Sequence, residues 1–461
     1  MPFDPTIAAI RFGTGLSPLI APPDSVAAML AALTGPDRIA ADWPIPAYSA
    51  LAPDTAALRL LNRDRNRARD AGQAAQAASL DAEVKAMRDA NRGIGDAAFL
   101  ATLIRGAVAP DGLRERLTAF WADHFTVKAN QGAIRHLVTP YVEEAIRPHL
   151  AGRFADMLRA VVTHPMMLNF LNQSASVGPN APAANGGRRG LNENLARELL
   201  ELHTVGVGAA YGQADVRELA ELLTGLSVDN AGVFGFDPRK AEPGAETVLG
   251  VTYGADATVD NVMAALENIA IHPATARHIV GKLAVHFVAD TPDSGLVDAL
   301  TARFTDTGGD LGAVYATLLD HPAAWARERA KVKPPVAYLT SALRALAVPP
   351  DVLIGLDRRD LNVTLQRPLR VMGQDWERPI GPDGWPEAAA AWITPQGMAG
   401  RIDWALSMPE ILRPDLPDPR QFVRDALGDS APATVTFAAG AAATRAEGVA
   451  MVLSAPAFQR R

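Results

Sequence analysis

The chain contains no cysteine among its 461 residues. This absence excludes disulfide bridges, thiolate metal ligands and a cysteine nucleophile. It leaves the cellular compartment open, because exported and cytosolic proteins can both lack cysteine. Without covalent cross-links the fold must rest on a hydrophobic core, and a chain of this length can bury a large one.

The chain also lacks any uninterrupted apolar run long enough to cross a bilayer. Its first residues show neither the basic start nor the apolar stretch of a signal peptide. We therefore expect no membrane span, and a cytoplasmic protein as the sequence is written, or an exported one if a leader has been removed. The net charge is −7, with both signs scattered and no basic stripe interleaved with aromatics, so nucleic acid is not expected as a partner.

Hydrophobic residues make up 48% of the chain and charged residues 21%, which is the composition of a globular protein. Apolar residues recur at helical spacing along most of it. We predict a mostly α fold, with a proline-rich N-terminal segment over 1–53 and a large multi-helix core domain over 54–461. Long helices are expected over 54–104, broken around Gly93 and Gly95. A small irregular or β-hairpin excursion is expected near 226–260, where aromatic and β-branched residues alternate with glycine and proline.

A polar helix is predicted from Asn192 to His203, after a loop rich in glycine, proline and asparagine. At 3.6 residues per turn, Asn194, Glu198 and Glu201 share one face of this helix. Two carboxylates one turn apart can hold a divalent metal, or act as general acid and base. Glu198 and Glu201 are therefore candidate catalytic residues and candidate metal ligands, with a divalent metal as the candidate cofactor.

A structural role for the same carboxylates stays open. Arg197 and Glu201 are four residues apart and can pair along the helix, and Glu198 can pair with an arginine from elsewhere. The first interpretation makes the protein an enzyme with a carboxylate-based site in a helical core. The second makes it a non-catalytic binding or scaffold protein, in which these carboxylates form a buried ion-pair network.

Two further residues are candidates for the same catalytic site. His124 lies among aromatic residues on an amphipathic helix, where it can serve as a ligand or proton shuttle, or as a core histidine bonded to backbone groups. Arg277 lies beside a face formed by His278, Lys282 and His286, which can bind an anion or pair with the carboxylates of the polar helix. Dinucleotide, phosphate-loop and nucleophile-elbow motifs are absent.

With these motifs in place, the chain resembles the bacterial family catalogued as domain of unknown function 1800. The resemblance runs from about Arg11 to about Arg460, through motifs in a fixed order. They are Phe120-Trp121-x-x-His124-Phe125, His164-Pro165-Met166-Met167-Leu168, Asn192-Glu193-Asn194-x-Ala196-Arg197-Glu198-Leu199-x-Glu201-Leu202-His203-Thr204, Asp215-Val216 through Leu223-Thr224-Gly225, His272-Pro273-Ala274-Thr275-Ala276-Arg277 with Lys282-Leu283 and His286-Phe287, Lys333-x-Pro335, Gly373-Gln374, Gly384-Trp385-Pro386 and Ser454-x-Pro456-x-Phe458-Gln459.

The resemblance implies a single helical unit and no particular activity, substrate or partner. The chain departs from the family pattern in two ways. Members are often exported, whereas this sequence as written shows no leader, and one internal stretch differs. Relatives usually carry His-Asp-Pro-Gly-x-Lys after the Thr-Gly helix, whereas this chain reads Ala241-Glu242-Pro243-Gly244-Ala245-Glu246. If the missing histidine and lysine serve an active site in relatives, the site of this protein is altered.

Overall fold

The computed structural model describes residues 3–129, 132–184 and 190–461. Most of these residues are helical, which confirms the predicted fold class. The excursion near 226–260 is also confirmed: β1 (Leu226–Val228) pairs with β2 (Phe234–Phe236), and β3 (Thr247–Val248) pairs with β4 (Val251–Thr252), both antiparallel. In the described part of the chain, no helix combines the length and the apolar character needed to cross a membrane.

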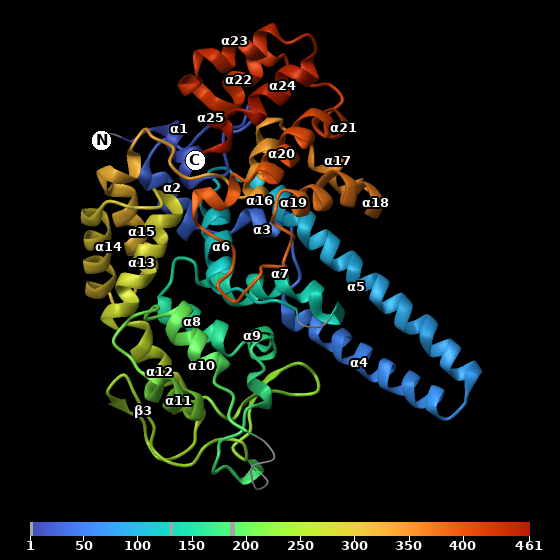
Figure 1. Ribbon diagram of the computed structural model, residues 1–461, viewed down its shortest axis with the longest axis vertical. Coiled ribbons are helices and arrows are strands. Elements are labelled where there is room, and N and C mark those ends of the chain that lie inside the picture. The colour runs from blue at the N-terminus through green and yellow to red at the C-terminus, as the bar shows by residue number, and fades with distance from the viewer. Residues whose placement is uncertain (1–2, 130–131, 185–189) are drawn as a thin grey trace.

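Two hydrophobic cores organise the helices (Figure 1). The larger core is built mainly from the N-terminal and middle parts of the chain, and Trp121 is fully buried in it. The elements around it are α1 (Pro5–Ile7), η1 (Ala8–Phe12), α2 (Val26–Thr34), η2 (Gly132–Leu137), α7 (Val138–Tyr141), η3 (Val142–Ile146), η4 (Arg147–His149), α6 (Leu113–His124), α8 (Phe154–Val162), α9 (Pro165–Phe170), α10 (Asn194–Glu198), η7 (Leu199–His203), α11 (Gln213–Leu222), α12 (Val259–Ala270), α13 (Pro273–Phe287), α14 (Ser294–Asp306), α15 (Leu311–Asp320) and η8 (Pro322–Trp325).

The second core is built from the C-terminal helices, drawn in orange and red in Figure 1, together with the last turns of α5 (Ala74–Val108), and Trp404 is buried in it. Burying a large apolar side chain of this kind is worth about 2–3 kcal/mol. The elements around it are α16 (Pro335–Ala345), α17 (Pro350–Ile354), α18 (Arg358–Leu361), η9 (Asn362–Gln366), α19 (Arg367–Val371), α20 (Pro395–Ser407), α21 (Pro409–Leu412), α22 (Pro419–Leu427), α23 (Ala433–Ala441), α24 (Arg445–Ser454) and α25 (Pro456–Gln459). Shorter turns are α3 (Arg38–Asp42), η5 (Gln173–Ala175), η6 (Pro182–Ala184), η10 (Ala389–Trp392) and η11 (Gly428–Ser430).

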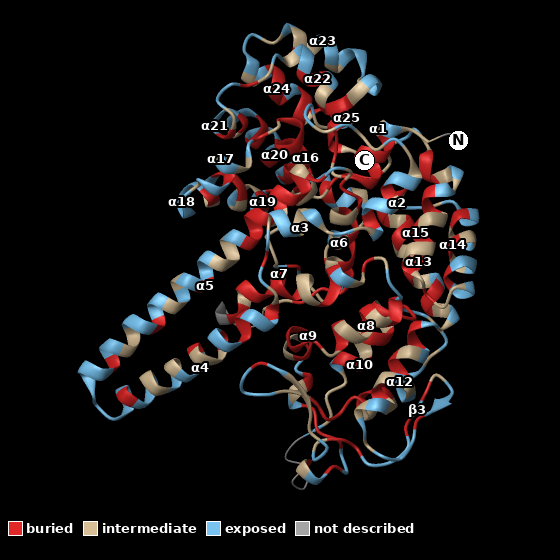
Figure 2. Ribbon diagram, turned by 180° about the vertical axis from the view of Figure 1, so that it is seen from behind, coloured by how far each residue is buried: buried red, intermediate tan, exposed pale blue. Residues whose placement is uncertain are grey.

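A long helical hairpin projects from this body (Figures 1 and 2). It is formed by α4 (Tyr48–Asp70) and α5 (Ala74–Val108), and its outer part is largely exposed. The prediction of a break at Gly93 and Gly95 was wrong, because α5 runs through both. At Gly95 the helix packs against His136, and a Cβ built on this glycine would lie 3.6 Å from the His136 Cβ, which is an ordinary contact distance. The chain turns at Gly72, whose φ of 70° suits glycine.

The division of the chain at residues 53 and 54 stays a prediction. That boundary falls inside α4, which begins at Tyr48. Phe12 and Met29, from the proline-rich segment, lie in the same core cluster as Trp121. In the structure, residues before the boundary thus share a core with residues after it.

Three His-Pro dipeptides each start a helix in the same way. The residue before a proline favours extended backbone, and proline is well suited to the first helical position. Nδ1 of His164, His272 and His321 then accepts a hydrogen bond from the backbone N–H two residues later, at 3.1, 3.2 and 3.2 Å. A histidine can accept there only while Nδ1 carries no proton, so each cap requires a neutral imidazole whose proton is on Nε2.

The predicted polar helix consists of two parts, α10 and the π-helical turn η7. Leu195 and Leu199 bury its apolar stripe in the larger core. The wider π turn ends with His203 buried, although a regular α-helix would carry that side chain away from the glutamate face. Single π turns of this kind occur often at functional sites.

Candidate active site

A cavity of about 260 Å³ lies between the two hydrophobic cores. Its walls come from α5, α6, α7 and α16, from the segment 374–387, and from Ile10 and Arg461 near the two ends of the chain. Small-molecule sites favour such junctions, where an apolar lining surrounds a few polar groups. Motif segments that carry the family resemblance converge here, because Lys333, Gln374 and Trp385 all line the cavity.

Asp123, in the last turn of α6, contributes one carboxyl group to this cavity. Its Oδ1 accepts a hydrogen bond from the Trp385 backbone N–H at 2.9 Å. Gly384, with a φ of 78°, permits this approach, since a Cβ there would lie 2.7 Å from the Asp123 carboxyl and carbonyl oxygens. Asp123 lies deep in the fold but is only half-buried, because part of its surface faces the cavity.

Burial raises the pKa of Asp123 to about 7, and nearby Glu387 and Asp383 also raise it. The Trp385 N–H and Lys282 act in the opposite direction, because both favour the carboxylate. A carboxyl group with this pKa can give or take a proton near neutral pH, which general acid–base catalysis requires.

A second carboxyl group in the cavity belongs to Glu377. Its Oε1 accepts from the Thr139 N–H at 3.0 Å and from Thr139 Oγ1 at 2.6 Å. Its backbone φ of 56° lies in the left-handed region, which costs energy for a residue other than glycine. Burial raises the pKa of Glu377 to about 7, despite the lowering effect of Thr139 and Arg135.

A charged array adjoins Asp123. His286 Nδ1 lies 2.5 Å from Glu387 Oε1, and His286 Nε2 lies 3.0 Å from an Arg116 guanidinium nitrogen. Lys331 Nζ lies 3.5 Å from Glu387 Oε2 and 2.6 Å from Asp290 Oδ1. This arrangement places the proton of neutral His286 on Nδ1, where it is donated to Glu387, and leaves Nε2 to accept from Arg116.

Of the sequence-predicted site residues, Glu198 and Glu201 lie close together. The pKa of Glu198 is raised by burial and by the charges of Glu201 and Asp383. Glu201 pairs with Arg197 at 3.3 Å, and these side chains are 29% and 39% exposed. The predicted pairing along the helix is therefore present, but it lies near the surface rather than in the core.

His124 is held by the end of the polar helix. Its Nε2 lies 3.1 Å from the backbone oxygen of His203, and His278 Nε2 lies 3.1 Å from that of Leu202. The two rings thus satisfy backbone oxygens that the end of a helix leaves without partners. Burial lowers the pKa of His124 well below its usual value, and its Nδ1 has no partner in the described part of the chain.

Arg277 does not join these residues. It pairs with Asp298 at 3.1 Å, and both side chains are exposed. His286 on the same helix pairs with Glu387 rather than with the carboxylates of the polar helix. The link between the polar helix and the cavity is Asp383, whose charge raises the pKa of both Glu198 and Asp123.

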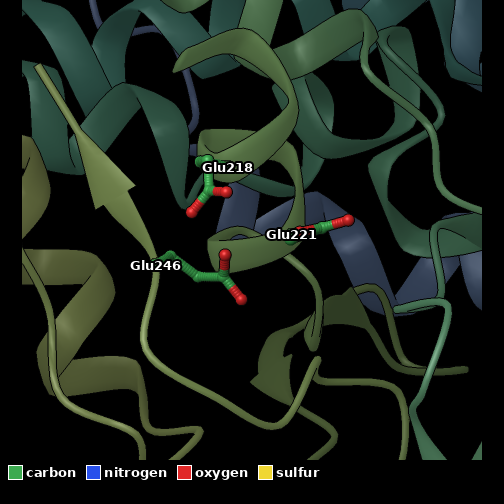
Figure 3. Close-up of side chains that lie close together, drawn as sticks. All are labelled: Glu218, Glu221 and Glu246. Carbon is green, nitrogen blue, oxygen red and sulfur yellow. The ribbon is translucent and has the colours of Figure 1, made fainter. Parts of the chain in front are cut away.

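Within the described residues, one group of three side chains is arranged like a metal-ligand set, and it lies elsewhere. Oxygens of Glu218, Glu221 and Glu246 lie within 4.8 Å of one another (Figure 3). Glu221 also pairs with Arg217 at 3.0 Å. Burial, together with Glu218 and Glu221, raises the pKa of Glu246 to about 8. Glu246 ends the stretch Ala241–Glu246 and adds a third carboxyl group to the two that α11 supplies.

Glu198 and Glu201 have no third such side chain close enough in the described ranges to complete a three-ligand set. A divalent metal bound by this pair stays a prediction. Asp123, Glu377 and Lys333 were not among the site residues predicted from the sequence. The sequence feature that could have pointed to them is that they lie in or near motifs of the family resemblance, namely Phe120–Phe125, Gly373-Gln374 and Lys333-x-Pro335. Only the fold shows that these motifs come together at one cavity.

Comparison with known proteins identifies the family. The chain belongs to the family described as "Protein of unknown function (DUF1800)", whose model matches residues 27–460. No curated protein and no solved structure gives a significant match. The function must therefore be argued from the cavity itself.

Proposed function

We propose that this family member is an enzyme that binds a small organic molecule between the two cores and transfers a proton to or from it. The observation that carries the proposal is that two carboxyl groups, Asp123 and Glu377, face one cavity and both have a pKa of about 7. Perturbed pKa values in a cavity are a physical indicator of an active site.

Asp123 is the proposed proton donor and acceptor. Its Oδ1 is fixed by the Trp385 N–H, while Oδ2 makes no hydrogen bond within the described part of the chain. Glu377 is oriented in the same manner by Thr139 through Oε1 alone. In each group one oxygen anchors the side chain and the other is left for a bound molecule, which is the preorganisation that proton transfer requires.

The array of His286, Glu387 and Arg116 supports this role without contacting the reacting proton. The negative charge of Glu387 raises the pKa of Asp123, and the hydrogen bond that His286 Nδ1 donates to Glu387 Oε1 holds that charge in place. Glu198 extends the proposed site toward the polar helix through Asp383. Glu201 and His124 are proposed to position this helix.

The alternative of a non-catalytic scaffold is favoured by one observation. The polar helix is bonded along its length, by Arg197 to Glu193 and Glu201 and by two histidines to its last carbonyls. Such bonding braces the helix against α6 and α13. It does not account for two carboxyl groups with raised pKa values in a separate cavity, so the enzyme is the better-supported function.

The test compares the full-length protein with Asp123→Asn, which keeps the size and the Oδ1 acceptor but cannot exchange a proton. Both are incubated with a mixture of small metabolites, and consumed and formed compounds are identified by mass spectrometry. Asp403→Asn, at an exposed aspartate on α20, is the matched control. We expect wild type and the control to convert a compound that Asp123→Asn converts about 10²–10⁴ times more slowly. Equal conversion by all three proteins, or none by wild type, contradicts the proposal.

A further inference from the structure

Lys333 occupies an unusual position in the cavity wall. It is 4% exposed, and its ammonium nitrogen lies 4.1 Å from the centre of the Phe458 ring. Its backbone oxygen is bonded by Arg401 at 2.8 Å, but its Nζ has no hydrogen bond or ion pair with any residue that the structure describes. Burial lowers the pKa of Lys333 well below its usual value, and Arg329, Arg116 and Arg401 add to this effect.

Arg116 faces the same cavity and is 5% exposed. One guanidinium nitrogen contacts His286 Nε2 at 3.0 Å, and its Nε has no partner among the described residues. The nearby carboxylate is that of Glu387, which already contacts His286 and Lys331. Arg116 therefore has no carboxylate of its own.

Two other buried arginines of the cavity wall pair with carboxylates. Arg105 pairs with Glu143 at 2.7 Å, and Arg147 pairs with Asp37 and Glu115 at 2.6 and 2.5 Å. Arg344 donates to backbone oxygens, among them that of Gly15 at 2.7 Å. A buried cation without such a partner is costly. Among the described residues, neither Arg116 nor Lys333 has a carboxylate within ion-pair distance, so the two are suited to a negative group brought by a bound molecule.

We propose that Arg116 and Lys333 form an oxyanion-binding subsite in the cavity, and that the bound molecule carries a carboxylate, phosphate or sulfate group. The two side chains are close enough for the charge of Arg116 to act on Lys333. A planar guanidinium and a primary ammonium are the usual protein groups for binding such oxygens. In naming this molecule as a substrate, the inference rests on the proposed function.

The two ends of the proposed substrate are thereby distinguished. Its anionic group meets Arg116 and Lys333, and its reacting group meets Asp123. Near neutral pH Asp123 and Glu377 are partly protonated, because burial raises the pKa of each to about 7. They therefore oppose an incoming anion less than two full carboxylates would.

The experiment measures binding of inorganic phosphate, sulfate and acetate to the full-length protein, by melting temperature and calorimetry, with chloride keeping the ionic strength constant. We expect at least one anion to raise the melting temperature of wild type in a saturable manner. Lys333→Met should weaken its binding at least tenfold, whereas Lys85→Met, at an exposed lysine on α5, should not. A response to acetate alone indicates a carboxylate, and a response to phosphate or sulfate alone indicates a tetrahedral oxyanion.

No saturable response to any of the three anions overturns the subsite, as does unchanged binding in Lys333→Met. The melting temperature of Lys333→Met without anions distinguishes a binding role of Lys333 from a structural one. If Lys333 is an unpaired buried amine, its replacement by methionine should raise the melting temperature. If Lys333 is purely structural, the same replacement should lower it. Asp123→Asn separates the subsite from the proposed function. If that variant binds the anion at least as tightly as wild type and no compound is converted, the subsite stands and the enzyme fails. If the protein converts only uncharged compounds and binds no anion, the enzyme stands and the subsite fails.

Discussion

His286 Nδ1 lies 2.5 Å from Oε1 of Glu387, a residue 101 positions further along the chain. This contact joins α13, which belongs to the larger core, to the loop that closes the cavity. Glu387 also lies 3.5 Å from Lys331. The Glu387 carboxylate thus contacts both His286 and Lys331 beside the cavity between the two cores.

Glu387→Gln should lower the free energy of unfolding at pH 7 by on the order of 3 kcal/mol, because it removes the carboxylate that His286 contacts and whose charge favours the cationic form of Arg116, and it leaves Lys331 with Asp290 alone. Chemical denaturation measures this. Glu410→Gln, at an exposed glutamate, is the control and should change stability by no more than about 0.5 kcal/mol. A loss as small as the control's would mean that Glu387 does not hold the array together.

The same variant has a defined pH dependence. Burial acts to raise the pKa of Glu387, but His286, Lys331 and Arg116 outweigh it and lower the pKa from 4.5 to about 2. A carboxyl group with a lowered folded-state pKa contributes stability above its unfolded pKa and loses it as the pH falls toward the folded value. The stability difference between wild type and Glu387→Gln should therefore shrink as the pH falls from about 4.5 toward 2.

Asp123→Asn should have the opposite pH dependence. The pKa of Asp123 is raised from 3.8 to about 7, first by burial. The folded state then holds its proton more tightly, so this contribution to stability is complete below about 3.8 and is lost as the pH rises through 7. Melting temperatures between pH 4 and 9 should fall more steeply for wild type than for Asp123→Asn. Parallel curves would show that this carboxyl titrates normally.

Glu246→Gln tests the crowded carboxylates of α11 and the altered stretch. The pKa of Glu246 is raised from 4.5 to about 8, so wild type should lose stability as the pH rises from about 4.5 through 8. At pH 9 we expect the variant to be more stable by on the order of 1 kcal/mol. Glu246→Lys should gain at least as much, because the lysine can pair with Glu218 and Glu221. Glu83→Gln, at an exposed position, should show neither effect.

The predicted metal at Glu198 and Glu201 is tested by elemental analysis of purified protein and of the double variant Glu198→Gln with Glu201→Gln. If the pair binds a divalent ion, wild type should carry a stoichiometric amount and the double variant none. The Arg197–Glu201 pair is partly exposed, so the substitutions themselves should cost only about 0.2–1 kcal/mol. Wild type without metal would exclude a tightly bound ion at this pair.

Much of the fold follows from local pattern. The spacing of Leu113, Leu117 and Phe120 is enough to predict α6, and the glycines and aromatics near 226–260 are enough to predict the small hairpins. The break in the α4–α5 hairpin was misplaced because glycine within a helix is only mildly unfavourable. Where tertiary packing stabilises the helix, as at Gly95 against His136, glycine does not end it.

The site was harder to predict because its members are far apart in the sequence and meet only in the folded chain. Asp123 and Trp385 are 262 positions apart, and the Trp385 backbone N–H donates a hydrogen bond to the Asp123 carboxyl group. The local sequence of Glu377 does not predict that its carboxyl group lines a cavity, because Trp376, Glu377 and Arg378 lie in a loop without regular periodicity. Glu198 and Glu201 attracted attention because helical periodicity places them on one face, and periodicity is visible in sequence whereas a cavity is not.

The position of the cavity between the two cores has a consequence for cooperativity. Neither core alone contains the cavity, since residues from Ile10 to Arg461 line it. A molecule bound there links the unfolding of one core to that of the other, and at 100 times its dissociation constant it adds about 2.7 kcal/mol to the native state. A bound molecule should therefore merge any separate melting steps of the two cores into one transition. The shape of the calorimetric trace would then show whether the cavity is occupied.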